Sequence, residues 1–315
     1  MTIVELSGVH KAFGSERVID GASWQLNMGE KIALVGMNGS GKTTLLRIIS
    51  GELPPDSGKV WLDPGIRIGY VPQEAKFDGS RLLREEICDQ DIIDMREKLE
   101  RMEKEISRLR EDKSMLTENM DEYDRLQTEF QNRDGYGYEA RLETILSRIG
   151  FDSSVLDVPA SALSGGQKSR AQLARVLLKQ PGLLLLDEPD SHLDVSALEW
   201  LEEFLSDYGG AVVIVSHDRY LLDKVAHKTL EIENGKLRQF NGNYTYYADQ
   251  KERALIRQHY DYVTQQQEIA RLREAIETLK LWCVKGNNPK FARRARSMEK
   301  RIERMELIDK PRRKE

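Results

Sequence analysis

The stretch KIALVGMNGSGKTTLLRIISG, residues 31–51, decides the fold. Its first part, KIALVG, is apolar and predicts a buried strand, and KTTLLRIISG predicts a short helix that ends at Gly51. Between them, GMNGSGKT matches the pattern G-x-x-x-x-G-K-S/T, in which glycines let backbone N–H groups surround phosphates at a helix N-terminus. A glycine-rich turn with an incidental lysine is the alternative, and the strand–loop–helix order argues against it. We therefore expect a phosphate-binding loop of the P-loop type.

This loop supplies the residues that would contact a nucleotide. They are Gly36, Met37, Asn38, Gly39, Ser40, Gly41, Lys42, Thr43 and Thr44. Lys42 would neutralise the β and γ phosphates, and the Thr43 hydroxyl would hold Mg²⁺. LLLLDE at 183–188 supplies the rest of such a site, because Asp187 ends a buried strand and can organise Mg²⁺, while Glu188 can polarise the attacking water. Solvated carboxylates at a strand end are the alternative for these two residues.

Helices and fully apolar strands alternate along much of the chain. The strands LLLLD (183–187) and AVVIVS (211–216) flank a helix near 195–206, which implies a parallel sheet covered on both faces. KVWLD (59–63) and IRIGYV (66–71) predict further strands, and TLEIENGKLRQF (229–240) predicts a hairpin. The expected fold class is therefore α/β, with a mostly parallel sheet.

Two long helical segments interrupt and follow this domain. Apolar residues recur at spacings of 4, 3, 4 and 3 among dense charges at Met95, Leu99, Met102, Ile106 and Leu109. A second seam runs from Leu116 to Phe130, so we expect two antiparallel helices, an arm inserted over about 88–136. From Tyr244 onward a coiled-coil-like hairpin is expected, with its tip at KGNNP (285–289). The predicted organisation is a domain at 1–243 that contains the arm, followed by a basic helical linker at 244–315.

Composition and charge limit the possible function classes. The chain has 315 residues, of which 32% are charged, and its net charge is −5. From Lys285 to Glu315, 12 Lys and Arg stand against 5 Asp and Glu, which suggests a basic segment that faces a polyanion. Two cysteines fit a reducing compartment, and the longest apolar runs are too short to span a bilayer. We expect a soluble, cytoplasmic protein without a signal peptide.

Six short motifs occur in a fixed order between residue 1 and about residue 240. They are GMNGSGKT (36–43), YVPQ (70–73), LSGGQ (163–167), LLLLDEP (183–189), SHLD (191–194) and VSHD (215–218). This set resembles the nucleotide-binding domain of the ATP-binding cassette superfamily. The resemblance implies a P-loop NTPase cassette with an α-helical signature subdomain, ATP and Mg²⁺ as ligands, and ATP hydrolysis to ADP and phosphate as the activity.

The resemblance also implies a role for individual residues. Phe13 would stack on adenine, although a lone phenylalanine is more often part of a core. Gln73 would reach Mg²⁺ and the attacking water, Glu188 would be the general base, and His217 would contact the γ-phosphate and hold that water. Asp194 would lie at the seam between two cassettes.

The LSGGQ motif poses a question, since a serine and two glycines at a helix start make a second phosphate site that lacks a lysine. The resemblance implies that this site serves the ATP of a different cassette, through Ser164, Gly165, Gly166 and Gln167. Two cassettes would meet head to tail, with each ATP between one P-loop and the opposite signature. ATPase activity would therefore need dimerisation or a second cassette.

The inserted arm and the segment FNGNYTYYADQKERAL (240–255) are similar to the ABC-F family. That likeness implies a cassette that acts on ribosomes, as a translation factor or in protection of the ribosome from antibiotics. The basic linker would contact rRNA or tRNA through Lys285, Lys290, Arg293, Arg294, Arg296, Lys300 and Arg301. A solvated helix face is the alternative for this segment.

Two other function classes stay open, and two departures from the family bear on them. The chain could be the energy-coupling subunit of a membrane transporter, or a regulatory cassette that binds ATP without turnover. Asp190-Ser191 stands where the family usually has Thr-Asn, and the added carboxylate could raise the proton affinity of Glu188 or perturb the seam between cassettes. Either effect bears on the hydrolysis rate more than on nucleotide binding. One P-loop and one signature are present, so we expect either a missing second cassette or pairing of two copies.

Overall fold

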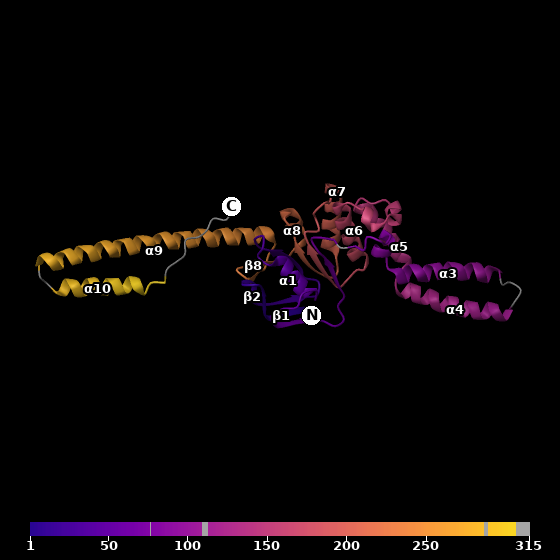
Figure 1. Ribbon diagram of the computed structural model, residues 1–315, viewed down its shortest axis with the longest axis horizontal. Helices are drawn as coiled ribbons and strands as arrows, with labels where there is room; N and C mark the ends of the chain where they lie inside the picture. Colours follow the sequence, from indigo (N-terminus) through magenta and orange to yellow (C-terminus); the bar gives the residue numbers. More distant parts are fainter. Residues whose placement is uncertain (76, 109–112, 287–288, 307–315) are drawn as a thin grey trace. The chain divides into compact units, whose positions relative to one another are not determined.

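The computed structural model describes residues 1–75, 77–108, 113–286 and 289–306 (Figure 1). The chain divides into two compact units, Met1–Thr245 and Tyr246–Glu315. Among the described residues, no helix is both long enough and apolar enough to cross a membrane.

A six-stranded sheet with the order β5-β6-β7-β3-β8-β9 forms the centre of the first unit. Its strands are β3 (Lys31–Val35), β5 (Ile68–Val71), β6 (Leu183–Asp187), β7 (Ala211–Val215), β8 (Lys228–Glu233) and β9 (Lys236–Phe240). Neighbours from β5 to β8 are parallel, and β9 pairs with β8 antiparallel as the predicted hairpin. Every residue of β3, β6 and β7 is buried, which confirms the predicted sheet covered on both faces.

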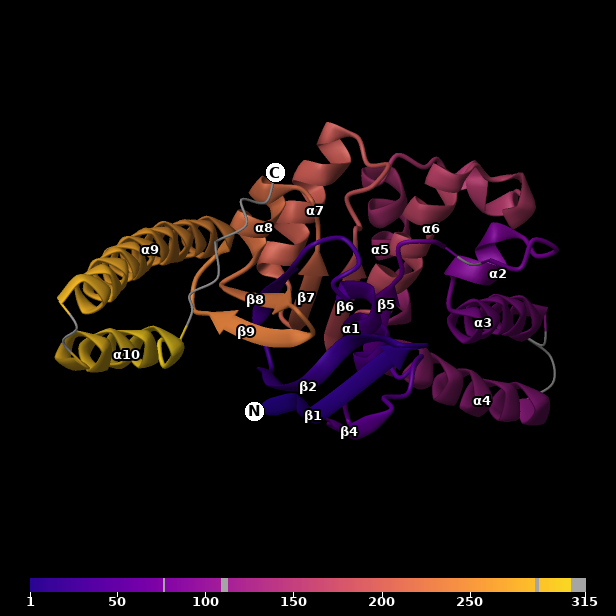
Figure 2. The ribbon, with the colours of Figure 1, turned by 60° about the vertical axis from the view of Figure 1, so that its left-hand side comes forward.

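A second, antiparallel sheet with the order β2-β1-β4 packs beside the first one (Figure 2). It comprises β1 (Thr2–Phe13), β2 (Glu16–Asn27) and β4 (Ser57–Leu62). One hydrophobic core joins the two sheets, since Leu6 and Leu26 of this sheet cluster with Leu185 and Val213 of the other. Helix α1 (Lys42–Ile49) adds Leu45, Leu46, Ile48 and Ile49 to the same core, which fixes the start of the helix at the phosphate-binding loop.

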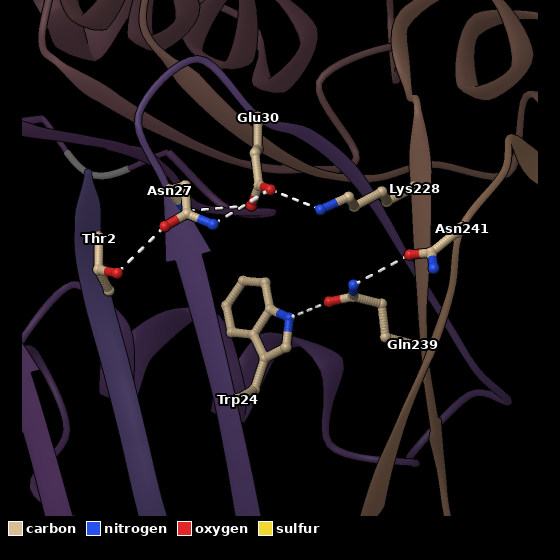
Figure 3. Close-up of polar contacts among 7 residues, drawn as sticks. All are labelled: Thr2, Trp24, Asn27, Glu30, Lys228, Gln239 and Asn241. Carbon is tan, nitrogen blue, oxygen red and sulfur yellow. Dashed lines mark hydrogen bonds and ion pairs between the residues drawn. The ribbon is translucent and has the colours of Figure 1, made fainter.

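Polar contacts also tie the two sheets together at one edge (Figure 3). The indole Nε1 of Trp24 on β2 donates to Gln239 Oε1 on β9 over 2.9 Å. At the end of β2, Glu30 accepts from the backbone N–H of Asn27 at 3.0 Å and from Lys228 Nζ at 2.5 Å. These contacts join the hairpin β8–β9 to the second sheet.

Besides α1 and the inserted arm, the first unit contains two groups of helices. α7 (Val195–Asp207) and α8 (Arg219–Val225) follow β6 and β7 along the chain. The helical subdomain contains α2 (Leu83–Ile87), α5 (Gly135–Arg148), α6 (Gly165–Leu178) and two short 3₁₀ helices at Ser153–Asp157 and Ala160–Ala162. Buried Leu83, Leu146 and Leu173 come from α2, α5 and α6. The predicted signature subdomain is thus present, with the LSGGQ motif at the start of α6.

The inserted arm consists of α3 (Gln90–Arg108) and α4 (Lys113–Asn132), which lie side by side (Figure 1). Leu99 and Met102 of the predicted seam are buried, as is Phe130 at the end of α4. An ion pair between Lys98 and Glu122, at 2.6 Å, connects the two helices. Residues 111–112 of the predicted break near 111–114 and the side chains of Leu109 and Leu116 fall outside the described part, whereas residues 113–114 begin α4.

The second unit contains most of α9 (Tyr244–Gly286) and all of α10 (Pro289–Glu303). Ile276 and Leu279 of α9 and Ala295 of α10 form a buried cluster against which Phe291, Met298 and Ile302 pack. Arg301 of α10 pairs with Glu268 of α9 at 2.6 Å. The two expected helices are present, whereas residues 287–288 of the predicted tip and the side chain of Lys285 fall outside the described part.

Candidate nucleotide site

The phosphate-binding loop connects β3 to α1 and requires glycine at several positions. Gly39 has φ 77° and Gly41 has φ 104°, which is left-handed backbone that favours glycine. A Cβ on Gly36 would lie 2.5 Å from Ser40 Oγ and 2.6 Å from the carbonyl oxygen of Ile232. The Ser40 N–H donates to the carbonyl oxygen of Met37 at 3.0 Å, which tightens the turn. The loop therefore needs the glycines that its sequence places there.

Lys42 is the cation of this loop, and its ammonium group turns back onto the loop. Its Nζ donates to the carbonyl oxygens of Gly36 at 2.9 Å and Met37 at 3.1 Å. Burial lowers the pKa of Lys42, and the nearby carboxylates of Asp187 and Glu188 act in the opposite direction. The loop thus carries a positive charge at the N-terminus of α1, where the helix dipole also stabilises an anion.

Asp187 ends strand β6 as a buried carboxylate, with 2% of the residue exposed. Burial raises its pKa, the hydrogen bond from Thr43 lowers it, the charge of Glu188 raises it and that of Lys42 lowers it. Within the described part of the chain, Asp187 Oδ2 and Ser40 Oγ are buried without a hydrogen-bond partner. Carboxylate and hydroxyl oxygens are the ligands that Mg²⁺ takes, so Asp187 and Thr43 fit that ion.

Two of the predicted catalytic side chains, Gln73 and His217, converge on the third, Glu188. Gln73 Nε2 donates to Glu188 Oε2 at 2.9 Å, and His217 Nε2 lies 3.4 Å from Glu188 Oε1. The three residues follow β5, β6 and β7, which are neighbouring parallel strands whose carboxyl ends lie at one edge of the sheet. This topology brings together residues that are far apart in the sequence.

The backbone of Glu188 is held in an uncommon conformation. Its φ of 54° is left-handed, which is rare for a residue with a Cβ and recurs at functional sites. Its N–H donates to the carbonyl oxygen of Val215 at 2.8 Å, and its own carbonyl accepts from Ser191 Oγ at 2.8 Å. These two bonds compensate for the strain and aim the side chain at Gln73 and His217.

Asp190 stands where the family usually has threonine, and its charge interacts with that of Glu188. Burial raises its pKa, a hydrogen bond from the Ser216 hydroxyl opposes that shift, and the charges of Asp218 and Glu188 add to it. Asp190 Oδ1 is buried without a partner among the described residues. Ser216, a residue that no sequence motif marks as functional, links this carboxyl to the segment that carries His217. The predicted effect on the proton affinity of Glu188 stays a prediction.

Phe13 and Tyr70 are two further residues to consider for this site. Phe13, at the end of β1, exposes 51% of its surface, and Lys11 Nζ lies 5.9 Å from its ring centroid. An exposed ring suits the stacking role that the resemblance implies, which stays a prediction.

The sequence motifs assigned no role to Tyr70. Its hydroxyl is buried without a hydrogen-bond partner among the described residues, and burial and the charge of Asp187 raise its pKa.

The signature residues are organised around the first turn of α6. The Ser164 N–H donates to Gln167 Oε1 at 2.9 Å, and Ser164 Oγ accepts from the Gln167 N–H at 3.3 Å, which is a capping box. Ser164 and Gly165 are exposed, and a Cβ on Gly166 would lie 3.2 Å from the Cβ of His192. In the part of the chain that the structure describes, no hydrogen bond joins these residues to the phosphate-binding loop.

Asp194, the predicted seam residue, caps the start of α7. Its carboxylate accepts from the Ala197 N–H at 2.8 Å and from Ser196 Oγ at 2.9 Å. These hydrogen bonds lower its pKa.

Comparisons with known proteins identify the family of this chain. A family described as ABC transporter matches residues 19–191, and a second family of the same description matches residues 230–315. The putative ATP-binding protein YdiF of Bacillus subtilis is 37% identical over 311 residues, which cover 99% of this chain and 48% of that protein. ABC transporter F family member 2 of Arabidopsis thaliana is 36% identical over 98% of this chain and 45% of its own length.

A third relative is named for a role in translation. The energy-dependent translational throttle protein EttA of Mycobacterium tuberculosis is 35% identical over 80% of this chain and 44% of that protein. The chain thus spans about half the length of the curated relatives that it matches.

Solved structures support the fold alone, because their sequences are distant. The ATP-binding subunit of an ABC transporter superimposes with a TM-score of 0.56 and 19% identity, over 76% of this chain and 90% of that one. A dimeric ATP-binding cassette bound to ADP and Pi gives a TM-score of 0.53 at 21% identity, over 76% of this chain and 98% of that one. The matched families, the named relatives and the loop–carboxylate geometry together place this chain in the ABC transporter family of ATP-binding cassettes, within its ABC-F branch.

Proposed function

We propose that the chain binds ATP with Mg²⁺ and hydrolyses it to ADP and phosphate. The observation that carries this proposal is the convergence of Gln73 and His217 on the Glu188 carboxylate, beside the loop that holds Lys42. The backbone N–H groups of the loop and the Lys42 ammonium hold the phosphates. Thr43 and Asp187 are the residues that would hold Mg²⁺, which supplies positive charge against the phosphate oxygens when it is bound.

Glu188 acts as the general base of this reaction. Its carboxylate accepts a proton from a water molecule, the water oxygen attacks the γ-phosphorus, and the bond from that phosphorus to the bridging oxygen of ADP breaks. Gln73 and His217 restrict the Glu188 side chain and position the water, because each lies within about hydrogen-bonding distance of one carboxylate oxygen.

A second cassette completes the nucleotide site. Support comes from the exposed Ser164 and Gly165 at the N-terminus of α6, a 14-residue helix whose first turn presents backbone N–H groups to an anion. ATP bound at the loop of one cassette is then covered by the signature of the other. Asp194 lies at the same seam. The partner is a second copy of this chain or a cassette of similar sequence.

The paired cassettes act on ribosomes. Two observations support this: relatives are named translational throttle proteins, and α10 presents exposed arginines. Arg293, Arg294 and Arg296 are exposed, and in the described part of the chain none of them has an ion-pair partner. Such a helix binds a phosphate backbone without reading bases. A translation factor and a protein that protects ribosomes from antibiotics both fit, and either would act in the cytoplasm.

Ribosome co-sedimentation with ATP tests this proposal. We compare the chain with a variant that carries Arg293→Glu, Arg294→Glu and Arg296→Glu on α10. The matched control carries Arg257→Glu, Arg271→Glu and Arg273→Glu, three exposed positions on α9 with the same total change of charge. Pelleting is expected to fall strongly for the α10 variant only, and to weaken steeply as salt is raised. Equal pelleting of the two variants, or purification with a membrane permease instead of ribosomes, would contradict the proposal.

A further inference from the structure

A cavity of about 660 Å³ lies at the edge of the central sheet opposite the nucleotide site. Its walls come from α7 and from the residues that precede β3, β6 and β7, whereas the nucleotide-site residues follow the other ends of the same strands. Each of these strands has five residues, so the two edges are about 16 Å apart. The cavity is therefore separate from the ATP site.

Three aromatic side chains form one wall of this cavity. Trp200, Phe204 and Tyr208 follow one another at intervals of four residues along α7 and its end, so they share a face of the helix. The ring centroids of Trp200 and Phe204 are 5.3 Å apart, and those of Phe204 and Tyr208 are 5.7 Å apart. All three residues are half-buried, so part of each side chain stays accessible.

The neighbouring loops hold this wall in place. The Tyr208 hydroxyl donates to the carbonyl oxygen of Pro181. A Cβ on Gly210 would lie 2.7 Å from the Tyr208 ring and 2.7 Å from the carbonyl oxygen of Gly182, so only glycine allows the loop this close. Met28, which is 47% exposed, also lines the cavity. The aromatic surface is thus formed before any ligand arrives.

Two carboxylates stand beside the aromatic wall. Glu203 and Asp207 line the cavity and lie one helical turn apart. Within the described residues neither forms an ion pair, whereas Glu202 on the same helix is paired with Lys224 at 3.0 Å. Three cations lie near these groups. The Lys31 ammonium donates to the carbonyl oxygen of Ser206, and its charge interacts with that of Asp207. Lys224, which pairs with Glu202, also interacts with the charge of Glu203, and the charge of Arg67 acts on Tyr208. The cavity therefore joins accessible aromatic faces with unpaired negative charge.

We propose that this cavity binds an arginine side chain presented by a partner protein. A guanidinium group stacks on aromatic faces and donates two parallel hydrogen bonds to a carboxylate, a combination that a lysine ammonium does not match. An anion would meet two negative charges, and a purely apolar side chain would give neither carboxylate a charged partner. The cavity is also larger than one guanidinium group, so it accommodates an extended segment on either side of the arginine.

Isothermal titration of the full chain with a short peptide tests this assignment. The probe is acetyl-Gly-Arg-Gly-Arg-Gly-amide, and the comparison peptide carries citrulline, a neutral side chain of the same shape, in place of arginine. Binding of the arginine peptide is expected, with the citrulline peptide weaker by about tenfold. The double variant Glu203→Gln, Asp207→Asn is expected to weaken the arginine peptide by about fivefold or more. Trp200→Leu, which keeps an apolar side chain, is expected to weaken it by about fivefold.

A matched variant separates this site from general attraction to an acidic protein. Glu202→Gln removes a negative charge from the same helix outside the cavity, and it is expected to change the affinity by less than about twofold. Circular dichroism establishes whether each variant is folded. If Trp200→Leu unfolds, the affinities of the charge variants decide the test. The assignment is overturned if arginine and citrulline peptides bind equally, if neither binds, or if Glu202→Gln weakens binding as much as the cavity variants.

Discussion

The side-chain amide of Gln73 donates a 2.9 Å hydrogen bond to Glu188, although 115 positions separate the two residues. The strand register explains this contact. Val71 of β5 lies opposite Leu186 of β6, and each of the bonded residues stands two positions beyond that pair. Because the strands are parallel, both residues lie beyond the same edge of the sheet, at equivalent positions in neighbouring strands. The contact follows from the order of the strands, and it places a polar partner on the carboxylate that we propose as the general base.

Replacement of that carboxylate tests its role. Glu188→Gln keeps the size of the side chain but removes the proton acceptor, so phosphate release is expected to fall by about 100-fold or more. ATP binding, measured with a fluorescent analogue, is expected to change little. Glu74→Gln is the matched control, since Glu74 is exposed next to Gln73, and it should keep the original rate. Unchanged turnover in Glu188→Gln would show that another group accepts the proton.

Lys42 should affect binding more than the catalytic step. Its ammonium now bonds to the carbonyl oxygens of Gly36 and Met37, and phosphate oxygens would replace them as partners. Loss of charge-assisted bonds worth about 1.5–3 kcal/mol predicts that Lys42→Ala weakens ATP binding by roughly 10- to 100-fold. Equilibrium dialysis measures this effect, and Lys59→Ala, at an exposed position on β4, is the control. Equal affinities of the two variants would place the nucleotide elsewhere.

Stability should depend on pH through Asp190, whose pKa is raised above its ordinary value of 3.8 mainly by burial. Below that value both the folded and the unfolded chain carry the proton. As the pH rises from 3.8 to the raised pKa, the unfolded chain releases its proton first, and the wild-type protein loses stability. Asp190→Asn escapes this loss and can still accept from Ser216. Urea unfolding is expected to find the variant more stable at neutral pH, with the difference shrinking towards pH 4.

Asp121→Asn provides the control for that experiment, because Asp121 is exposed on α4. It should follow the wild-type protein over the whole range. A constant difference between wild-type protein and Asp190→Asn at every pH would mean that the carboxyl does not titrate in this way.

The contact between the two sheets should contribute measurably to stability. Trp24 is 7% exposed, and its indole N–H donates to Gln239 (Figure 3). Gln239→Leu leaves this donor without a partner and is expected to lower the free energy of unfolding by about 1–3 kcal/mol. Gln25→Leu, at the exposed neighbouring position on β2, should change it by less than about 0.5 kcal/mol. Similar losses in both variants would show that the hydrogen bond to Trp24 is not responsible.

Sequence patterns predicted those parts of the fold whose signal is local. The buried strand, loop and helix at residues 31–51 follow from apolar runs and glycine spacing, and the arm and the linker hairpin follow from helical periodicity. The order β5-β6-β7-β3-β8-β9 has no local signal, because it depends on how distant strands pack. For the same reason the bond from Trp24 to Gln239 could not be predicted.

The candidate site also combines features that have a local sequence signal with features that depend on how distant segments pack. The glycines and Lys42 form a contiguous motif, so their proximity follows from the sequence. Gln73 and His217 were assigned by resemblance, and their convergence on Glu188 depends on the strand order. The sequence shows that aspartate stands at position 190 where the family usually has threonine. The burial of Asp190 and its hydrogen bond from Ser216 can be seen only in the folded chain. What Ser164 contacts across a pair of cassettes stays a prediction, since it concerns two chains.

Complementation between two inactive variants tests the central claim, that the loop of one cassette and the signature of another share one ATP. Lys42→Ala removes the loop cation but keeps the signature, and Ser164→Arg blocks the signature but keeps the loop. Each variant alone should release little phosphate. In a mixture, a pair of unlike chains contains one intact loop that faces one intact signature. The rate of phosphate release should therefore rise well above the mean of the two separate rates. This increase should become larger at higher protein concentration. A mixture that only averages the two rates at every concentration would contradict the shared site.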